Sequence, residues 1–258
     1  MKKMIALLLA LTMVLALAAC GSKNKTMVYA VEAGSAGEAA AQEEGFEINS
    51  VDTQAKALME VDAGTSDAAI IDSLMAGAMV GEGTSYPDLV VTDQKLTEEL
   101  YGAGCRKGSD LAAYINDVMS EAYADGTMQE LAKTYGVQEA LVEQPAATGS
   151  APAADGDVAY IQDKGTLVVG ITDFAPMDYK DASGEWIGFD ADMAKIVAEK
   201  LGVEIQFVEI DWDNKVFELD GKAIDVVWNG MTLTDAMLAA MECTNPYCNN
   251  AQVVVTKG

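Results

Sequence analysis

The most informative segment of the sequence is Asp225-Val226-Val227-Trp228-Asn229-Gly230-Met231-Thr232-Leu233-Thr234. Its apolar start predicts a buried strand, and the polar, Gly-containing part predicts a loop, after which Thr234 can cap a helix through Met241. Backbone N–H groups at such a turn are unpaired and attract anions. Asn229 and Thr232 add side-chain donors and acceptors. Two interpretations are open: a binding loop at a strand end, or an ordinary turn inside a parallel sheet.

A second segment of the chain repeats this pattern. Residues 57–73 and residues 216–229 each predict a short amphipathic helix, a Gly turn, an Asp, an apolar strand and a polar residue at its end. The polar residues at matching places are Asp72 and Asn229. Ligands of open α/β sheets bind beyond the carboxyl ends of the strands. The repeat therefore predicts two related α/β units that each contribute to one site.

The N-terminus has the form of an export signal. Lys2 and Lys3 precede an apolar run over residues 4–19, which is too short to span a membrane comfortably. Its ending, Leu17-Ala18-Ala19-Cys20, resembles a bacterial lipobox, in which the Cys is acylated and becomes the first mature residue. We therefore expect an extracytoplasmic protein that is anchored to the cell membrane through lipid on Cys20.

The composition excludes several functions. Asp and Glu number 41 against 16 Lys and Arg, so nucleic acid is not an expected partner. The chain has no His, which excludes His-based triads and His metal sites, and we expect no metal or other cofactor. Cys105 is expected to be a buried apolar residue. Cys243 and Cys248 either form a local disulfide or remain free, since spacing does not settle geometry.

A change of composition divides the chain. Residues 143–156 are rich in Pro, Ala, Gly and Ser, as in a flexible linker. Before the linker, a Gly-rich turn at residues 34–37 follows a predicted strand and opens a helix, which makes an anion-friendly helix start. Residues 101–107 predict one strand, and two amphipathic helices follow within residues 108–142.

Several motifs together resemble a known family. In the second half they are Leu167 to Asp173, Trp186 to Ala194, Asp225 to Thr234 and Asn245-Pro246-Tyr247. These resemble the first lobe of the bacterial amino-acid-binding proteins of ABC importers. Residues 33–38, 67–72, 101–108 and 124–127 resemble the second lobe and closing helices of that family. The resemblance implies a type II periplasmic-binding-protein-like α/β fold, in which two lobes close on a ligand by hinge motion.

The order of these motifs departs from the family, whose first-lobe sequence comes first. The departure implies a circular permutation in which residues 143–156 join the old C-terminus to the old N-terminus. The domains implied are then a signal peptide at 1–20, lobe 2 at 21–107, helices packing on lobe 1 at 108–142, the linker at 143–156 and lobe 1 at 157–258.

The resemblance also implies the binding residues. Phe174 would stack on the ligand, Trp212 would form a wall, and Asn229, Gly230 and Thr232 would form a polar strand-end loop. Ser35 and Ala36 would form the helix start on the facing lobe. Asp72 would receive the ligand's α-ammonium, and Asp173 would contact its side chain. Many family members bind the α-carboxylate with an Arg at the position of Met237. Without that Arg, we expect a carboxylate to rely on Thr232 and on backbone N–H groups near Gly230 and Ser35.

The function implied is a lipid-anchored, monomeric solute-binding protein. It would capture an amino acid or similar small polar solute and deliver it to the membrane subunits of an ABC importer. Two alternatives are open: a ligand sensor not coupled to transport, and a dehydratase-like enzyme on the same scaffold. An enzyme needs a poised acid or base, for which Asp72 and Asp173 are available without any His or cleft Arg. We expect a binding protein and no enzyme.

Overall fold

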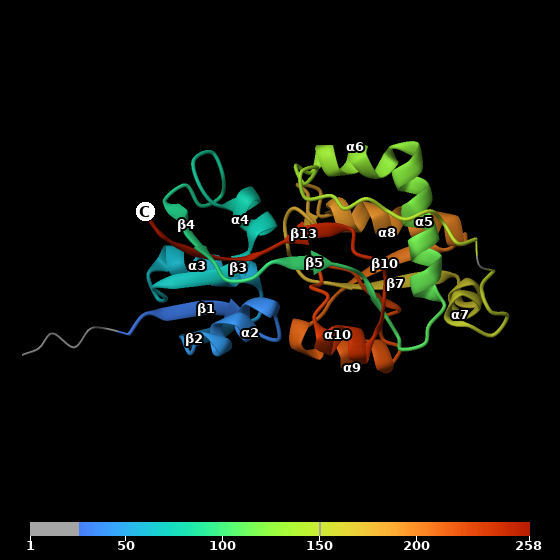
Figure 1. Ribbon diagram of the computed structural model, residues 1–258, viewed down its shortest axis with the longest axis horizontal. Coiled ribbons are helices and arrows are strands. Elements are labelled where there is room, and N and C mark those ends of the chain that lie inside the picture. The colour runs from blue at the N-terminus through green and yellow to red at the C-terminus, as the bar shows by residue number, and fades with distance from the viewer. Residues whose placement is uncertain (1–25, 150) are drawn as a thin grey trace, which may run out of the picture.

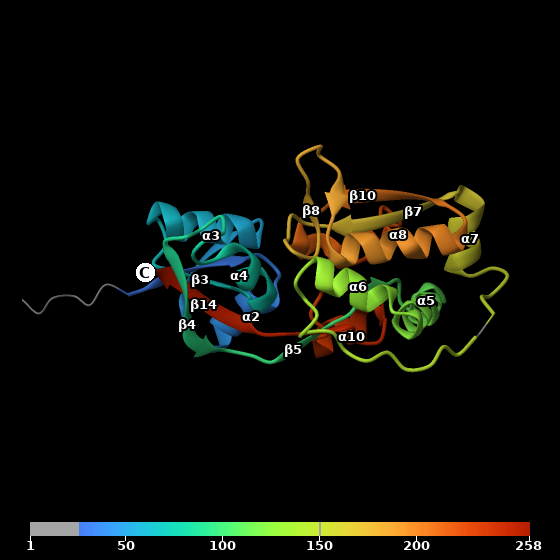
Figure 2. The ribbon, with the colours of Figure 1, turned by 90° about the horizontal axis from the view of Figure 1, so that it is seen from above.

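The computed structural model describes residues 26–149 and 151–258. The chain forms two α/β lobes, each built on a mixed five-stranded sheet. The lobes lie side by side in two perpendicular views (Figures 1 and 2). The predicted leader, with Cys20, lies outside the described residues. We call the lobe that contains the N-terminal strands lobe 2 and the other lobe 1.

Lobe 2 has the strand order β2-β1-β3-β14-β4, in which β14 runs antiparallel to both of its neighbours. Its elements are β1 (Val28–Glu32), α2 (Ala36–Glu43), β2 (Glu47–Val51), α3 (Gln54–Ala63), β3 (Ala68–Asp72), α4 (Ser73–Met79), β4 (Leu89–Lys95) and β14 (Gln252–Lys257).

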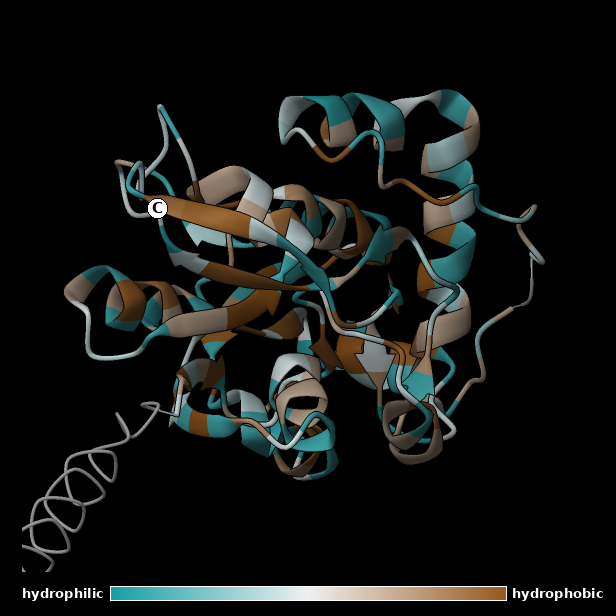
Figure 3. Ribbon diagram, turned by 60° about the vertical axis from the view of Figure 1, so that its left-hand side comes forward, coloured by the Kyte–Doolittle hydropathy of each residue, from teal (hydrophilic) through white to brown (hydrophobic). Residues whose placement is uncertain are grey.

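The local sequence explains these elements. β3 is buried at all five residues, as its apolar composition requires in the middle of a sheet covered on both faces. The Thr53 side chain caps α3 by accepting a hydrogen bond from Lys56 N at 3.1 Å, and Gly64, at φ 77°, ends that helix. Hydrophobic residues accordingly gather along the central strands of this lobe (Figure 3).

Lobe 1 has the strand order β10-β7-β11-β6-β12. Its elements are β6 (Gly104–Cys105), α5 (Leu111–Asp125), α6 (Thr127–Thr134), α7 (Asp157–Lys164), β7 (Thr166–Ile171), β8 (Tyr179–Lys180), β9 (Trp186–Ile187), α8 (Phe189–Leu201), β10 (Glu204–Glu209), the 3-10 turn η1 (Trp212–Asn214), α9 (Lys215–Asp220), β11 (Val226–Val227), α10 (Asp235–Ala240) and β12 (Glu242–Cys243). Helices α5 and α6 pack on α8, and Figure 2 shows all three on one side of the β7–β10 pair.

Two extended segments join the lobes. β5 (Glu99–Tyr101) and β13 (Cys248–Asn250) pair with each other in antiparallel fashion between the two sheets. The chain passes through β5 from lobe 2 to lobe 1, and through β13 back to lobe 2 (Figure 1). A pair of crossing strands of this kind is the usual form of a hinge.

The crossings correct the sequence analysis at two places. The single strand predicted for residues 101–107 is two strands, since β5 pairs in the hinge and β6 pairs in the lobe 1 sheet. β14 completes the sheet of lobe 2, although residues 157–258 were assigned to lobe 1, and β6 belongs to lobe 1 rather than to the 21–107 range. The physical reason is the same in each case. Where the chain crosses between the lobes, the strand that follows pairs its backbone groups within the sheet of the lobe that it enters.

The predicted linker contains no helix or strand in its described residues, and its backbone lies against α5. Thr148 N and Gly149 N donate to the Asp117 carboxylate, and Ala153 N donates to Asp110. In Figure 1 it runs around the outside of lobe 1 to α7. Gln144 near its start is buried and donates to Pro246 O at 2.9 Å, whereas the rest of the described linker lies on the surface of the lobe.

The cysteines follow one of the open alternatives. Cys105 is fully buried, as predicted. Cys243 and Cys248 are both free thiols, because they lie on β12 and β13, which belong to different sheets. Within the described part of the chain, no helix has the length and apolar character needed to cross a bilayer.

Candidate functional site

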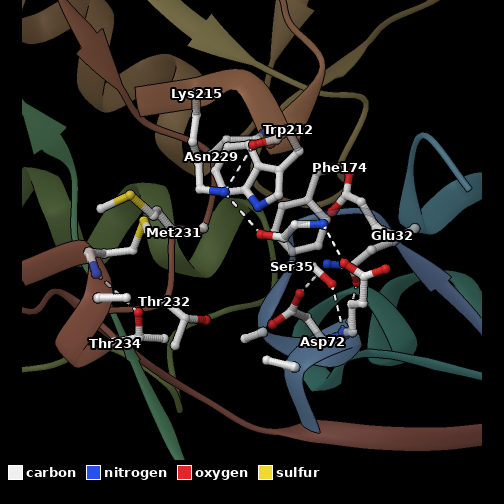
Figure 4. Close-up of a pocket in the computed structure, with 18 of the residues that line it drawn as sticks. Glu32, Ser35, Asp72, Phe174, Trp212, Lys215, Asn229, Met231, Thr232 and Thr234 are labelled. Carbon is white, nitrogen blue, oxygen red and sulfur yellow. Dashed lines mark hydrogen bonds between the residues drawn. The ribbon is translucent and has the colours of Figure 1, made fainter. Parts of the chain in front are cut away.

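The two lobes face each other across a cavity of about 250 Å³ (Figure 4). The end of β1, the start of α2 and the end of β3 form one wall, and residues from η1 to α10 form most of the other. Eight of the nine residues predicted to bind a ligand line this cavity: Ser35, Ala36, Asp72, Phe174, Trp212, Asn229, Gly230 and Thr232.

The ninth residue, Asp173, lies elsewhere. It borders a separate hollow together with Tyr179 and Lys180, whereas its neighbour Phe174 lines the cavity. Partial burial and the nearby Glu209 raise the pKa of Asp173. The contact to a ligand side chain assigned to Asp173 stays a prediction.

Asp72 ends β3 and is 4% exposed. Its carboxylate accepts hydrogen bonds from the side-chain amides of Gln54 and Asn250, and from Gln252 Nε2 at 2.9 Å. Burial, and secondly the charge of Glu99, raise the pKa of Asp72 to about 7. Three amide donors, from α3, β13 and β14, therefore already surround this carboxylate.

Glu32 ends β1 beside Asp72 and is 3% exposed. Its Oε1 atom has no hydrogen-bond partner in the described structure. Burial is the main cause that raises the pKa of Glu32 to about 8. The charge of Asp72 adds to the shift, while Lys215 and Gln54 oppose it. A buried carboxylate with a free oxygen is costly unless a cation or donor meets it.

The strand-end loop of lobe 1 uses its polar groups internally. Asn229 Oδ1 accepts from Thr172 N at 2.9 Å and from Thr172 Oγ1 at 2.6 Å, and its Nδ2 donates to Asp178 at 2.8 Å. Gly230 N donates to Asp190 at 2.7 Å. The expectation that a ligand carboxylate would find free N–H groups near Gly230 is thus corrected for Gly230 itself.

The hydroxyls of the site also have partners. Ser35 Oγ caps α2 by accepting from Glu38 N at 3.0 Å, and Thr234 Oγ1 caps α10 by accepting from Met237 N at 3.2 Å. Thr232 Oγ1 donates to Glu99 at 3.0 Å. Met237 also lines the cavity.

Lys215 begins α9 and is 5% exposed. Its Nζ donates to Trp212 O and, across the lobe boundary, to Gly34 O, both at 2.9 Å. Burial lowers the pKa of Lys215, against the opposing effects of Glu32 and Asp213. Of the described residues that line the cavity, Lys215 alone carries a positive charge.

Sequence reasoning missed Glu32 and Lys215. Glu32 occupies the same place at the end of β1 that Asp72 occupies at the end of β3, and these parallel strands end at the same edge of one sheet. That equivalence was the available signal. For Lys215 the sequence offered none, since a Lys in an amphipathic helix is usually exposed. No group of His, Cys, Asp or Glu within residues 26–149 and 151–258 is arranged to hold a metal ion.

Residues 167–258 match the family model of the bacterial extracellular solute-binding proteins, family 3. The chain is 38% identical over 93 residues to a probable amino-acid ABC transporter-binding protein of Haemophilus influenzae, a match that covers 36% of each protein. It is 33% identical over 100 residues to the L-cystine-binding protein TcyJ of Escherichia coli, covering 38% of each. The chain thus spans little more than a third of the length of these relatives, which are named as binding proteins and not as enzymes.

Solved structures match over a similar share of the chain. An ancestral cationic amino acid solute binding protein is 38% identical, with a TM-score of 0.32, and the match covers 33% of this chain and 37% of the other. A substrate-binding protein of an ABC uptake transporter from Streptococcus pneumoniae, solved with bound histidine, is 32% identical, with a TM-score of 0.32 and coverage of 34% and 36%.

Proposed function

We propose that this protein binds an amino acid between its two lobes and delivers it to the membrane subunits of an ABC importer. The observation that carries the proposal is the cavity. It lies between lobes joined by two crossing strands, and it is lined by carboxylates from lobe 2 and by an ammonium group and aromatic residues from lobe 1. A volume of about 250 Å³ suits a ligand of amino-acid size.

The chemistry of the walls supports a ligand that carries an ammonium group. Glu32 and Asp72 place two carboxylates on the lobe 2 side, where the ligand's ammonium would be held (Figure 4). Phe174 and Trp212 offer apolar faces to the remainder of the ligand. The relatives named for L-cystine and arginine support an amino acid as the class of ligand.

The proposal includes the predicted location. The protein acts outside the cytoplasm as a monomer, tethered to the membrane by lipid on Cys20. Substituting Cys20→Ser should leave an unprocessed precursor. Normal processing and membrane binding in that variant would contradict the lipid anchor.

The circular permutation is also part of the proposal. Tyr29 at the start of β1 and Thr256 at the end of β14 both pair with Ala68, so the two ends of the described fold lie together (Figure 1). When two chain ends lie close together, they can be joined and the chain opened at another loop without a change of fold. Arg106 supports the same arrangement, because its guanidinium pairs with Asp157 at 3.0 Å and Asp225 at 3.3 Å, both beyond the linker.

Thermal unfolding of the full chain with a panel of the standard amino acids and cystine tests the function. A ligand that binds only the folded state stabilises it by about 2.7 kcal/mol at a hundred times its Kd. We expect at least one α-amino acid to raise the Tm and to be recovered unchanged. A shift by another solute class alone would overturn the proposed ligand. Consumption of the ligand would favour the dehydratase-like alternative.

A further inference from the structure

The two carboxylates of lobe 2 differ in whether their oxygens already have hydrogen-bond partners. Asp72 receives three side-chain amides, from Gln54, Asn250 and Gln252. Glu32 is as deeply buried and lines the same cavity, yet its Oε1 has no partner among the described residues. Buried polar atoms are nearly always hydrogen-bonded in native proteins, so an orphaned carboxylate oxygen at a cavity wall points to a missing donor.

The opposite wall offers the complementary charge. An ammonium group has three N–H donors, and Lys215 uses two of them, on Gly34 O and Trp212 O. The third has no hydrogen-bond partner among the described residues, and Lys215 is the one described residue with a positive charge that lines the cavity. These two carbonyl bonds, together with the Trp212 ring 4.7 Å from Nζ, fix the position of the ammonium group at the cavity wall.

We propose that Glu32 and Lys215 recognise the two ends of an α-amino acid, Glu32 through the ligand's ammonium and Lys215 through its carboxylate. This inference rests on the proposed function and names the residues that carry it. Asp72 then acts indirectly. It holds the Gln54 amide, which contacts both carboxylates, and it keeps Asn250 of β13 and Gln252 of β14 in place. The ligand would bridge the lobes and favour their closed arrangement.

Glu38 provides a matched control for Glu32. It also lines the cavity, but its Oε2 accepts from Gly34 N at 2.8 Å and its Oε1 accepts from Ser50 Oγ at 2.9 Å. Both oxygens are therefore occupied, and Glu38 is not needed for the ligand. Glu32→Gln and Glu38→Gln make the same chemical change at two places on one wall.

The experiment measures Kd by titration calorimetry for the full chain and for Glu32→Gln, Lys215→Met and Glu38→Gln. The probes are the best-binding amino acid of the panel, its decarboxylated amine and its desamino acid. Loss of a hydrogen bond to a charged group corresponds to a roughly ten- to hundredfold weakening. We expect that loss for the amino acid in Glu32→Gln and Lys215→Met, and less than about threefold in Glu38→Gln, which is within the scatter of surface changes.

The analogues decide which end each residue holds. Glu32→Gln should not weaken the desamino acid, and Lys215→Met should not weaken the decarboxylated amine, since each analogue already lacks the group concerned. Wild-type affinity for the amino acid in Glu32→Gln, or equal losses for all three probes, would overturn the inference while leaving the proposed function intact. If no amino acid binds the wild-type chain, the proposed function and this inference fall together. Melting curves of each variant establish that it is folded.

Discussion

The two walls of the cavity are built in opposite ways. On lobe 1, the polar groups of the loop around Asn229 and Gly230 form hydrogen bonds within the lobe, to Thr172, Asp178 and Asp190. The loop therefore offers the ligand a shaped surface more than a charge. On lobe 2, Glu32 reaches the cavity with a carboxylate oxygen that no described residue satisfies. The difference indicates that this loop supplies a rigid surface for the ligand, whereas Glu32 of lobe 2 and Lys215 of lobe 1 supply the groups that select it.

The largest effect is expected where the rigid wall is tightest. Gly230 has φ 55°, and a Cβ atom there would lie 2.4 Å from the Phe174 ring. Gly230→Ala should destabilise the fold by roughly 2 to 4 kcal/mol, from overpacking together with left-handed strain, and should abolish ligand binding. Urea unfolding and calorimetry measure the two losses.

Gly108 is the matched control for this substitution. It has φ 76° but nothing within 4 Å of an added Cβ, so Gly108→Ala should cost only about 1 kcal/mol and leave binding unchanged. Equal effects of the two substitutions would mean that the close contact with Phe174 does not constrain the loop.

The second prediction concerns stability of the ligand-free protein against pH. The pKa of Glu32 is about 8 in the folded state against 4.5 as the ordinary value. Between these values the unfolded chain releases a proton that the folded chain keeps. The contribution of Glu32 to the free energy of unfolding is therefore fully present below pH 4.5 and is lost as the pH rises through 8. Glu32→Gln should remove part of this decline and be the more stable protein at pH 8.

Asp72, Lys215 and Gln54 face Glu32 and are present in both proteins. The comparison therefore isolates the carboxyl group of Glu32. Thermal unfolding of wild type and Glu32→Gln from pH 5 to pH 9 makes the measurement. Parallel curves over this range would show that Glu32 does not hold its proton in the folded state. A gain in stability at pH 8 together with lost binding would show that Glu32 is retained for the ligand at a cost in stability.

A smaller effect is expected from restoring the usual cation on lobe 1. Met237→Arg puts a guanidinium on the wall that lacks one, and an Arg–carboxylate pair can form two hydrogen bonds. In the Lys215→Met background it should recover about tenfold of the lost affinity for the amino acid, and none for the decarboxylated amine. Calorimetry of the double variant tests this, and no recovery would place the carboxylate elsewhere in the cavity.

The smallest effect is expected from cutting the linker. Its described residues bond to Asp110 and Asp117 at α5, and Gln144 Nε2 donates to Pro246 O at 2.9 Å. Replacing residues 147–151 with a protease site and cleaving there should leave fragments that co-elute and still bind ligand, because the Arg106 ion pairs and the lobe 1 core hold them together. Refolding should become concentration-dependent. Fragments that separate under native conditions would contradict a permuted lobe 1.

Much of this architecture was accessible from the sequence, and the exceptions have physical causes. The strand that ends at Asp72 and the loop at Asn229 were predicted because an apolar run followed by a polar group marks a strand end. The exchange of β6 and β14 between the lobes was missed, since pairing across sheets leaves no local pattern. The roles of Glu32 and Lys215 depend on burial at a surface between two lobes, which neither lobe's own periodicity encodes.

The most direct test of the proposed ligand is to identify the small molecule that the purified protein carries. The full chain is purified without added ligand and denatured, and the released compounds are identified and counted by mass spectrometry. We expect an α-amino acid that the wild-type protein carries, that Glu38→Gln retains and that Glu32→Gln has lost. A different class of solute, or the same amino acid retained in full by Glu32→Gln, would contradict it.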